Sequence, residues 1–216
     1  MKNMKKLLYV VLAVFIANTA FAQSNKAKSI LDKVSAKYDS YNTLQSNFLL
    51  KVTPRTGEAS TVNGKILVNK PEDKFKIELA DQDIYGDANT TWTVSKEVKE
   101  VQVNSADEGN QKIGPSNIFT FYKKGFNYKY VGTNNVAKEG KVDVIDLVPT
   151  DKTTNYQKIT LRVNSKSHIH DVSILDKSGA KYTYAFNALY VNHAISNASL
   201  QFNKQNYPGY EVVDLR

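Results

Sequence analysis

Residues 44–103 decide the fold class of this chain, because apolar and polar side chains alternate through most of the stretch. The alternating segments are Leu44–Val52 (LQSNFLLKV), Gly64–Leu79 (GKILVNKPEDKFKIEL), Thr91–Val94 (TWTV) and Val98–Val103 (VKEVQV). Alternation with a period of two is typical of antiparallel strands that bury one face. Almost no helical period interrupts the series, so we expect a curved sheet with an apolar inner face.

The first 22 residues have the pattern of an export signal. Three lysines (Lys2, Lys5, Lys6) precede the apolar run Leu7–Ala17, and Ala20-Phe21-Ala22 supplies the small residues of a cleavage site. The run is shorter than the roughly 20 residues of a membrane-spanning helix, which favours cleavage over an uncleaved anchor. The chain has no cysteine, so the signal is not a lipoprotein signal and the mature chain makes no disulfide. We expect removal of 1–22 and a periplasmic location.

Residues 23–216 are expected to form a single domain. They number 216 − 22 = 194, enough for one sizeable core. The formal charge of +8 becomes 8 − 3 = +5 once the signal lysines are removed, and the remaining charges are spread along the chain. Ordinary solubility charge explains this excess, while attraction to anionic lipid surfaces or acidic partners stays open. No basic run with interleaved aromatic residues predicts a nucleic-acid partner.

One amphipathic helix is expected before the strands. Apolar residues recur there at helical spacing, while charged residues occupy the other side, the apolar set being Ile30, Leu31, Val34, Tyr38 and Tyr41. After the deciding stretch, strand signals resume from Tyr128 to Phe186, which brings the total to roughly ten or eleven strands.

The segment Pro115–Gly125 breaks the strand period. It has a proline suited to a helix start, lysines near its end and a glycine suited to a helix stop. Its large apolar residues, including Ile118, Phe119 and Phe121, fall on more than one side of such a helix. This short helix is either fully buried or covers something apolar that binds and leaves. We predict that these three residues line or cover the mouth of a cavity.

Sequence patterns for catalysis and cofactor binding are mostly missing. The chain has no GxGxxG, Walker or GxSxG motif, and the absence of cysteine excludes thiol catalysis and Cys-based zinc sites. His168 and His170 are two apart in an expected strand and could share a face with room for a metal. Exposed strand histidines are more often plain surface residues, so we predict no enzyme, no metal and no cofactor.

The chain is rich in bulky apolar groups on its expected sheet, with 13 Tyr, 9 Phe and the single Trp92. They either fill a packed core or leave a cavity for a small ligand. Alternation along the early strands places one apolar set on a shared face of each strand. We predict that this set lines a lipid-binding cavity: Phe48, Leu50, Ile66, Val68, Phe75, Ile77, Leu79 and Trp92.

The order of these features resembles the LolA family of periplasmic lipoprotein carriers over essentially the whole mature chain. The most specific parts are Lys70-Pro71-Glu72-Asp73-Lys74-Phe75, similar to a basic-Pro-x-x-Phe pattern, and Asp87–Trp92, similar to the family's Asp-Gly-Lys-x-x-Trp turn and strand. The ending Tyr207–Asp214 (YPGYEVVD) also resembles the family's Pro-Gly-Val-x-Val-Ile. The first match departs from the family in two ways: a lysine stands where the best-known carriers have arginine, and the segment is one residue longer.

The resemblance implies a mainly β (α+β) fold, an incomplete antiparallel β-barrel of about 11 strands with short lid helices over a hydrophobic cavity. It implies a carrier, not an enzyme, that takes acylated lipoproteins from an inner-membrane lipoprotein-releasing ABC transporter to an outer-membrane acceptor, as a monomer. It also implies a lid-holding role for Lys70, although an ammonium cannot reproduce the guanidinium fork. A carrier or sensor for another lipid or glycolipid is the alternative on the same fold, and a fully packed scaffold barrel is a third hypothesis.

Overall fold

The structure of the chain, a computed structural model, describes residues 22–106, 113–114, 117–137 and 139–216. The expected export signal lies outside the described residues except for Ala22, so its cleavage stays a prediction. A helix covers residues 22–39, and its buried side chains recur at helical spacing: Ala27, Leu31, Val34 and Tyr38. The expected N-terminal amphipathic helix is therefore confirmed.

In the described part of the chain, twelve strands form one sheet. Their bounds are β1 (Thr43–Thr53), β2 (Ser60–Asn69), β3 (Lys74–Leu79), β4 (Gln82–Gly86), β5 (Thr90–Ser95), β6 (Glu100–Ser105), β7 (Phe126–Val136), β8 (Gly140–Pro149), β9 (Tyr156–Asn164), β10 (Ile169–Asp176), β11 (Lys181–Val191) and β12 (Glu211–Asp214). Short helices within the described ranges include η1 (Phe121–Lys123), α3 (Asn197–Leu200) and η2 (Lys204–Asn206).

The sheet is open, with the order β12-β6-β5-β4-β3-β2-β1-β11-β10-β9-β8-β7. Neighbouring strands are antiparallel except β12, which pairs in parallel with β6. The two edges, β7 and β12, do not meet, so the expected incomplete barrel is confirmed. The strand beyond the expected 11 arises because the C-terminal segment returns to the far edge of the sheet.

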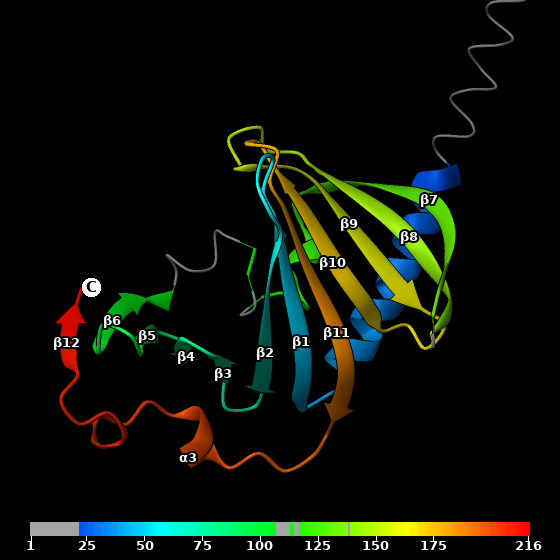
Figure 1. Ribbon diagram of the computed structural model, residues 1–216. Helices are drawn as coiled ribbons and strands as arrows, with labels where there is room; N and C mark the ends of the chain where they lie inside the picture. The colour runs from blue at the N-terminus through cyan, green and yellow to red at the C-terminus, as the bar shows by residue number, and fades with distance from the viewer. Residues whose placement is uncertain (1–21, 107–112, 115–116, 138) are drawn as a thin grey trace, which may run out of the picture.

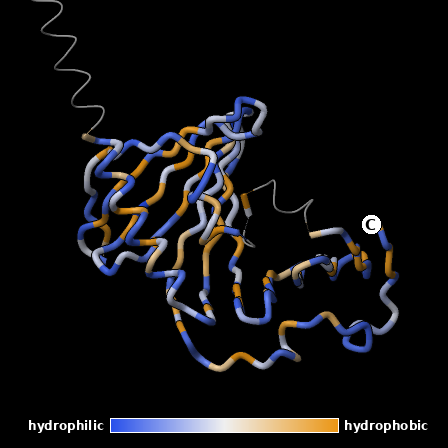
Figure 2. The backbone as a smooth tube through the Cα atoms, turned by 180° about the vertical axis from the view of Figure 1, so that it is seen from behind, coloured by the Kyte–Doolittle hydropathy of each residue, from blue (hydrophilic) through white to orange (hydrophobic). Residues whose placement is uncertain are grey.

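The sheet has two parts (Figure 1). Strands β7–β11, β1 and β2 curve around the N-terminal helix, and we call this part the cradle. Strands β3–β6 and β12 extend away from it, and we call this part the leaf. Figure 2 shows the same arrangement from behind, with apolar residues running along the strands of the cradle. The main core lies between the helix and the inner face of the cradle.

Two glycines adapt the inner face to aromatic rings. Gly64 of β2 is opposite Phe48 of β1, and a Cβ at Gly64 would lie 2.2 Å from the Phe48 ring. Phe75 of β3 lies in the same way against Gly86 of β4, at 2.1 Å from such a Cβ. The rings therefore lie flat on the neighbouring backbone, an arrangement associated with curved sheets.

The C-terminal segment crosses the outer face of the leaf between β11 and β12. A second core cluster forms there from Tyr85, Val94 and Val101, with Trp92, Phe202, Tyr207 and Tyr210 packed against it. The Tyr207 hydroxyl donates to Asp83 Oδ2 at 3.0 Å and lies 2.8 Å from the Tyr85 hydroxyl. We call residues 197–210 the strap, because they join the cradle to the outer edge of the leaf.

Candidate functional site

Most of the predicted cavity residues share the inner face of the sheet. Strand register aligns them across β1, β2 and β3, for example Leu79 opposite Gly64 and Ile77 opposite Ile66. Phe48, Ile66 and Ile77 are fully buried in the main core, while Leu50, Val68, Phe75 and Leu79 are partly buried against it. These residues form an apolar wall.

Trp92 does not belong to this wall. It is opposite Tyr85 in the β4–β5 pair, and Tyr85 is opposite Lys76, which alternates with Phe75 and Ile77. Trp92 therefore lies on the outer face, where its ring stacks on Phe202 at 5.9 Å between ring centroids. The inclusion of Trp92 in a shared inner face was wrong, because the strap covers the outer face of the leaf and buries apolar residues there too.

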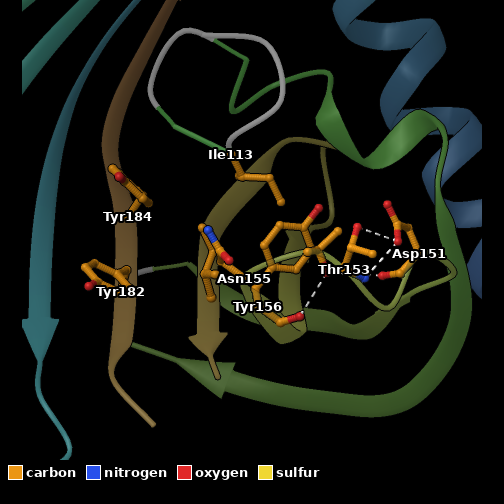
Figure 3. Close-up of a pocket in the computed structure, with 9 residues that line it drawn as sticks. Ile113, Asp151, Thr153, Asn155, Tyr156, Tyr182 and Tyr184 are labelled. Carbon is orange, nitrogen blue, oxygen red and sulfur yellow. Dashed lines mark hydrogen bonds between the residues drawn. The ribbon is translucent and has the colours of Figure 1, made fainter. Parts of the chain in front are cut away.

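A cavity of about 590 Å³ opens at the end of the cradle where β8 ends and β9 and β11 begin (Figure 3). Its polar side comes from the β8–β9 loop, namely Asp151, Thr153, Thr154 and Asn155. Its apolar side comes from Ile113, Ile174 and the rings of Tyr156, Tyr182 and Tyr184. A space of this size with a largely apolar lining and few polar groups is typical of small-molecule sites.

The electrostatics of the cavity follow from its two sides. Asp151 Oδ1 accepts hydrogen bonds from the backbone N–H and the hydroxyl of Thr153, both at 2.8 Å, and these bonds lower the pKa of the Asp151 carboxyl. Burial raises the pKa of the Tyr184 phenol, with a smaller contribution from Tyr182. Burial also raises the pKa of Tyr156, and Asp151 adds to that shift. At neutral pH the cavity therefore combines uncharged phenols with one ionised carboxylate.

The predicted lid segment packs inside the cradle. We call residues 117–124 the plug; they form a turn and the short helix η1. Ile118 and Phe119 are buried in the main core, and Phe121 is partly buried. Phe119 stacks on Tyr38 of the N-terminal helix at 5.1 Å and lies 4.9 Å from the Phe186 ring of β11. The expected start of this helix, at residues 115–116, lies outside the described residues.

Contacts join the plug both to the helix and to the cavity. Lys123 Nζ pairs with Asp39 at 2.7 Å, and the Ser35 hydroxyl donates to the Tyr122 hydroxyl at 3.4 Å. On the other side, Phe121 contacts the Phe126 ring edge-on at 5.9 Å, and Phe126 stacks on the cavity residue Tyr156 at 6.1 Å. The plug thus lies between the helix and the cavity.

Lys70 lies at the C-terminal end of the helix. Its Nζ donates to the carbonyl oxygens of Tyr38 at 2.8 Å and Asp39 at 3.0 Å. Burial lowers the pKa of the Lys70 ammonium, Asp39 opposes that shift, and Lys123 adds to it. The Lys70 side chain therefore binds the C-terminal end of the helix next to Asp39, which pairs with Lys123 of the plug.

The two histidines have different partners, and only His170 lies in a strand, because β10 begins at Ile169; the expectation that both share one strand was wrong for His168. His168 Nε2 lies 2.7 Å from the Tyr41 hydroxyl, whereas His170 Nε2 lies 3.5 Å from Asp171 Oδ2. His170 lies at a register shift between Ile169 and Asp171. In the described part of the chain, no cluster of three or more His, Cys, Asp or Glu residues could hold a metal ion.

The predicted site residues and the cavity lining do not overlap. The lining comes from late strands and the β8–β9 loop, whereas the prediction used the early strands. The alternation of Tyr182, Tyr184 and Phe186 was a usable signal, because it places three rings on one face of β11. The loop residues carry no periodic signal, and only the fold brings Asp151 and Asn155 to those rings.

Within the described ranges, no helix is long and apolar enough to cross a membrane. Comparison with curated proteins by sequence found no match. Among solved structures, the fold is similar to an uncharacterized conserved protein from Thermus thermophilus, with a TM-score of 0.60, 10% identity, and coverage of 88% of this chain and 99% of that chain. It is also similar to MucB, with a TM-score of 0.51, 17% identity, and coverage of 83% of this chain and 64% of MucB.

A further similar structure is a LolA superfamily protein from Nitrosomonas europaea, with a TM-score of 0.45, 13% identity, and coverage of 82% of this chain and 97% of that chain. The family described as outer membrane lipoprotein carrier protein LolA matches residues 39–203. This match spans the cradle, the plug and strands β3–β6 of the leaf, and it ends within the strap. The chain therefore belongs to the LolA family.

Proposed function

We propose that this protein is a periplasmic carrier that holds acyl chains of lipoproteins inside its cradle and shuttles them from the inner to the outer membrane. Membership of the LolA family supports a lipid or lipoprotein carrier in general terms. The observation that carries the proposal is the cavity of about 590 Å³, which opens at one end of a curved sheet with an apolar interior. LolA family carriers perform no enzymatic reaction, which fits this role.

The energetics of acyl transfer suit a passive carrier. Each buried methylene contributes about 0.8 kcal/mol, so a palmitoyl chain needs roughly 13 kcal/mol of apolar shelter to cross water. An interior about as apolar as a membrane makes loading nearly neutral in free energy. Delivery then requires only an acceptor that binds the chains somewhat better.

The plug has the role of the lid in this proposal. Ile118, Phe119 and Phe121 fill the space between the helix and the sheet that acyl chains would otherwise occupy. At the surface, the Lys123–Asp39 ion pair joins the plug to the end of the helix. Movement of the plug would connect the cavity to the apolar wall formed by Phe48, Leu50, Ile66, Val68, Phe75, Ile77 and Leu79. Lys70 would hold the plug in its closed position through its hydrogen bonds to the carbonyl oxygens at the C-terminal end of the helix.

Lipoproteins are the partners that family membership implies. The proposed donor is an inner-membrane lipoprotein-releasing ABC transporter, and the proposed recipient is an outer-membrane acceptor. The export pattern of residues 1–22 supports a periplasmic location. A carrier or sensor for another lipid or glycolipid remains the second candidate, favoured by the polar loop on one side of the cavity.

The test places a charge in the cavity. Tyr182→Glu introduces a carboxylate at a partly buried lining position, and Tyr190→Glu makes the same change on the same strand at a side chain that is 48% exposed. We expect Tyr182→Glu to lose uptake of a pyrene-labelled monoacylglycerol while remaining folded, because an unpaired charge in an apolar site is costly. Tyr190→Glu should bind as the wild type does.

Thermal unfolding of each variant separates binding from folding. A wild-type protein that takes up no probe, or a folded Tyr182→Glu variant with normal uptake, would contradict the proposal. Mass spectrometry of lipids and lipopeptides that copurify from the native envelope identifies the cargo and separates the two candidates.

A further inference from the structure

The described lining of the cavity has a single formal charge, and that charge is negative. Among the described residues that line it, Asp151 is the one ionisable group charged at neutral pH, and no lysine or arginine joins it. The nearby cation Lys177 donates its Nζ to the Lys152 carbonyl at 2.6 Å, outside the lining. A bound amphiphile would therefore place its head group beside a carboxylate.

The two oxygens of the Asp151 carboxylate differ in their hydrogen bonds. Both of its hydrogen bonds, from the Thr153 N–H and hydroxyl, end on Oδ1. Across the described part of the chain, Oδ2 accepts no hydrogen bond. The loop thus holds the carboxylate in place and leaves one oxygen available to a head group that donates hydrogen bonds or carries positive charge.

The tyrosine hydroxyls supply hydrogen-bond donors, whereas the Asp151 carboxylate supplies an acceptor. Tyr182 and Tyr184 alternate along β11 and line the cavity with Tyr156 (Figure 3). Within the described ranges, none of these three hydroxyls makes a hydrogen bond. A phenol O–H donates readily to a carbonyl oxygen, so the apolar side of the cavity contains donors suited to the ester carbonyls of an acylglycerol.

We propose that this cavity selects acyl esters with an uncharged or cationic head group over those with an anionic head group. Asp151 faces the head group, and the hydroxyls of Tyr182 and Tyr184 donate to the ester carbonyl oxygens. The inference rests on the proposed function and adds the class of cargo. It disfavours free fatty acids and anionic phospholipids, which would bring a second negative charge to the Asp151 rim.

The first experiment measures head-group selection by competition. A pyrene-labelled monoacylglycerol is bound to the protein and displaced by palmitoylcholine, monopalmitoylglycerol or palmitoyl lysophosphatidylglycerol, each below its critical micelle concentration. Wild type should bind the cationic and neutral esters about fivefold more tightly than the anionic one, a preference of the size expected for an exposed charge. Asp151→Asn should reduce this preference to near unity, and Asp151→Lys should reverse it.

Asp176→Asn is the matched control. Asp176 is the last residue of β10, is partly buried, and accepts hydrogen bonds from Ser178 and Ala180 of the following turn, but it does not line the cavity. Its substitution should leave the preference unchanged. An equal effect of Asp176→Asn would show that net charge, not the Asp151 rim, sets the selection and would overturn the inference.

The second experiment tests the tyrosine hydroxyls. Monopalmitoylglycerol is compared with hexadecylglycerol ether, which has the same head group but no ester carbonyl. Wild type should prefer the ester by about fivefold, the size of one net hydrogen bond. The double variant Tyr182→Phe/Tyr184→Phe retains the rings and should lose this preference.

The outcomes separate the two proposals. Absence of saturable probe binding by wild type would overturn the proposed function and this inference with it. Saturable binding with no dependence on head-group charge, or with an ester preference that survives the double substitution, would overturn the inference alone.

Discussion

At the scale of single residues, the close approach of rings to glycine shapes the inner face. The Phe48 ring occupies the position that a side chain at residue 64 would need. Since cores tolerate little overpacking, the pair fixes both the identity of residue 64 and the rotamer of Phe48.

Gly64→Ala should destabilise the protein by about 1–3 kcal/mol, because the added methyl overlaps the Phe48 ring. Chemical denaturation measures the loss. Adding Phe48→Leu should make the alanine better tolerated. Gly114→Ala is the control, since a Cβ there meets no described atom within 4 Å. Equal losses at both glycines would contradict the ring-on-glycine explanation.

His168 couples protonation to the end of the N-terminal helix. Burial lowers the pKa of its imidazole, and Lys37 and Lys166 lower it further, while Glu139 opposes them. Its Nε2 lies 2.7 Å from the Tyr41 hydroxyl, just beyond the helix. The folded state therefore binds a proton on His168 less readily than the unfolded state.

The sign of the pH effect follows. The contribution of His168 to stability is fully present above the unfolded pKa of about 6.5 and is lost as the pH falls through the lower folded pKa. We expect the thermal midpoint to fall between about pH 7 and pH 5, and His168→Gln to flatten this part of the profile. His193→Gln, at an exposed loop position, should retain the wild-type profile. An unchanged slope in His168→Gln would exclude this residue as the cause.

At the scale of elements, the sequence predicted which segments are strands or helices better than it predicted which strand faces lie on the same side of the sheet. Alternation assigns the residues of one strand to two faces, so Phe75, Ile77 and Leu79 were correctly grouped. It does not say which face of β5 continues the inner face of β3, because that depends on the register set by two turns. Trp92 was misplaced for this reason, and the outer face of the leaf is apolar because the strap covers it.

The cavity itself depends on contacts between distant segments. Ile113, the β8–β9 loop and β11 meet only after the sheet curves, and no local pattern links them. The plug was identified by its apolar residues on several sides, and its two interpretations, buried or covering, are both consistent with its placement beside the cavity. Its role as a lid stays a prediction.

Lys70 gives a prediction for the helix as an element. Lys70→Met should destabilise the protein by about 0.5–1 kcal/mol, because the last carbonyls of the helix lose a cationic donor. Lys70→Arg, which retains the charge, should lose less. Lys33→Met, an exposed change on the same helix, serves as the control for denaturation measurements. A Lys70→Met variant as stable as wild type would show that water replaces the ammonium there.

At the scale of the whole molecule, the strap connects the cradle to the leaf. The Tyr207 hydroxyl reaches Asp83 and the Tyr85 hydroxyl on β4, and β12 completes the edge beside β6. The leaf has its own small core there, so its stability depends on a segment that is remote in sequence.

Tyr207→Phe should weaken the leaf selectively, by about 1–2 kcal/mol, because Asp83 loses a donor in a nearly buried position. Hydrogen exchange should become faster in β4–β6 and stay unchanged in β9 and β10. Tyr210→Phe, in the same cluster, should have a smaller effect, since within the described chain its hydroxyl makes no hydrogen bond. Uniform acceleration over the whole sheet would contradict an independently weakened leaf.

The parallel pairing of β12 with β6 also determines the order in which the strands of the sheet can pair during folding. Most neighbouring strands are adjacent in sequence, but Glu211 pairs with Glu100, and such distant contacts form late because a long loop must close first. As the chain is synthesised, β6 emerges early, and one of its edges stays unpaired until β12 has been made. Open edges recruit other chains. Premature truncation near the C-terminus should therefore produce a protein that folds its cradle and aggregates through its leaf.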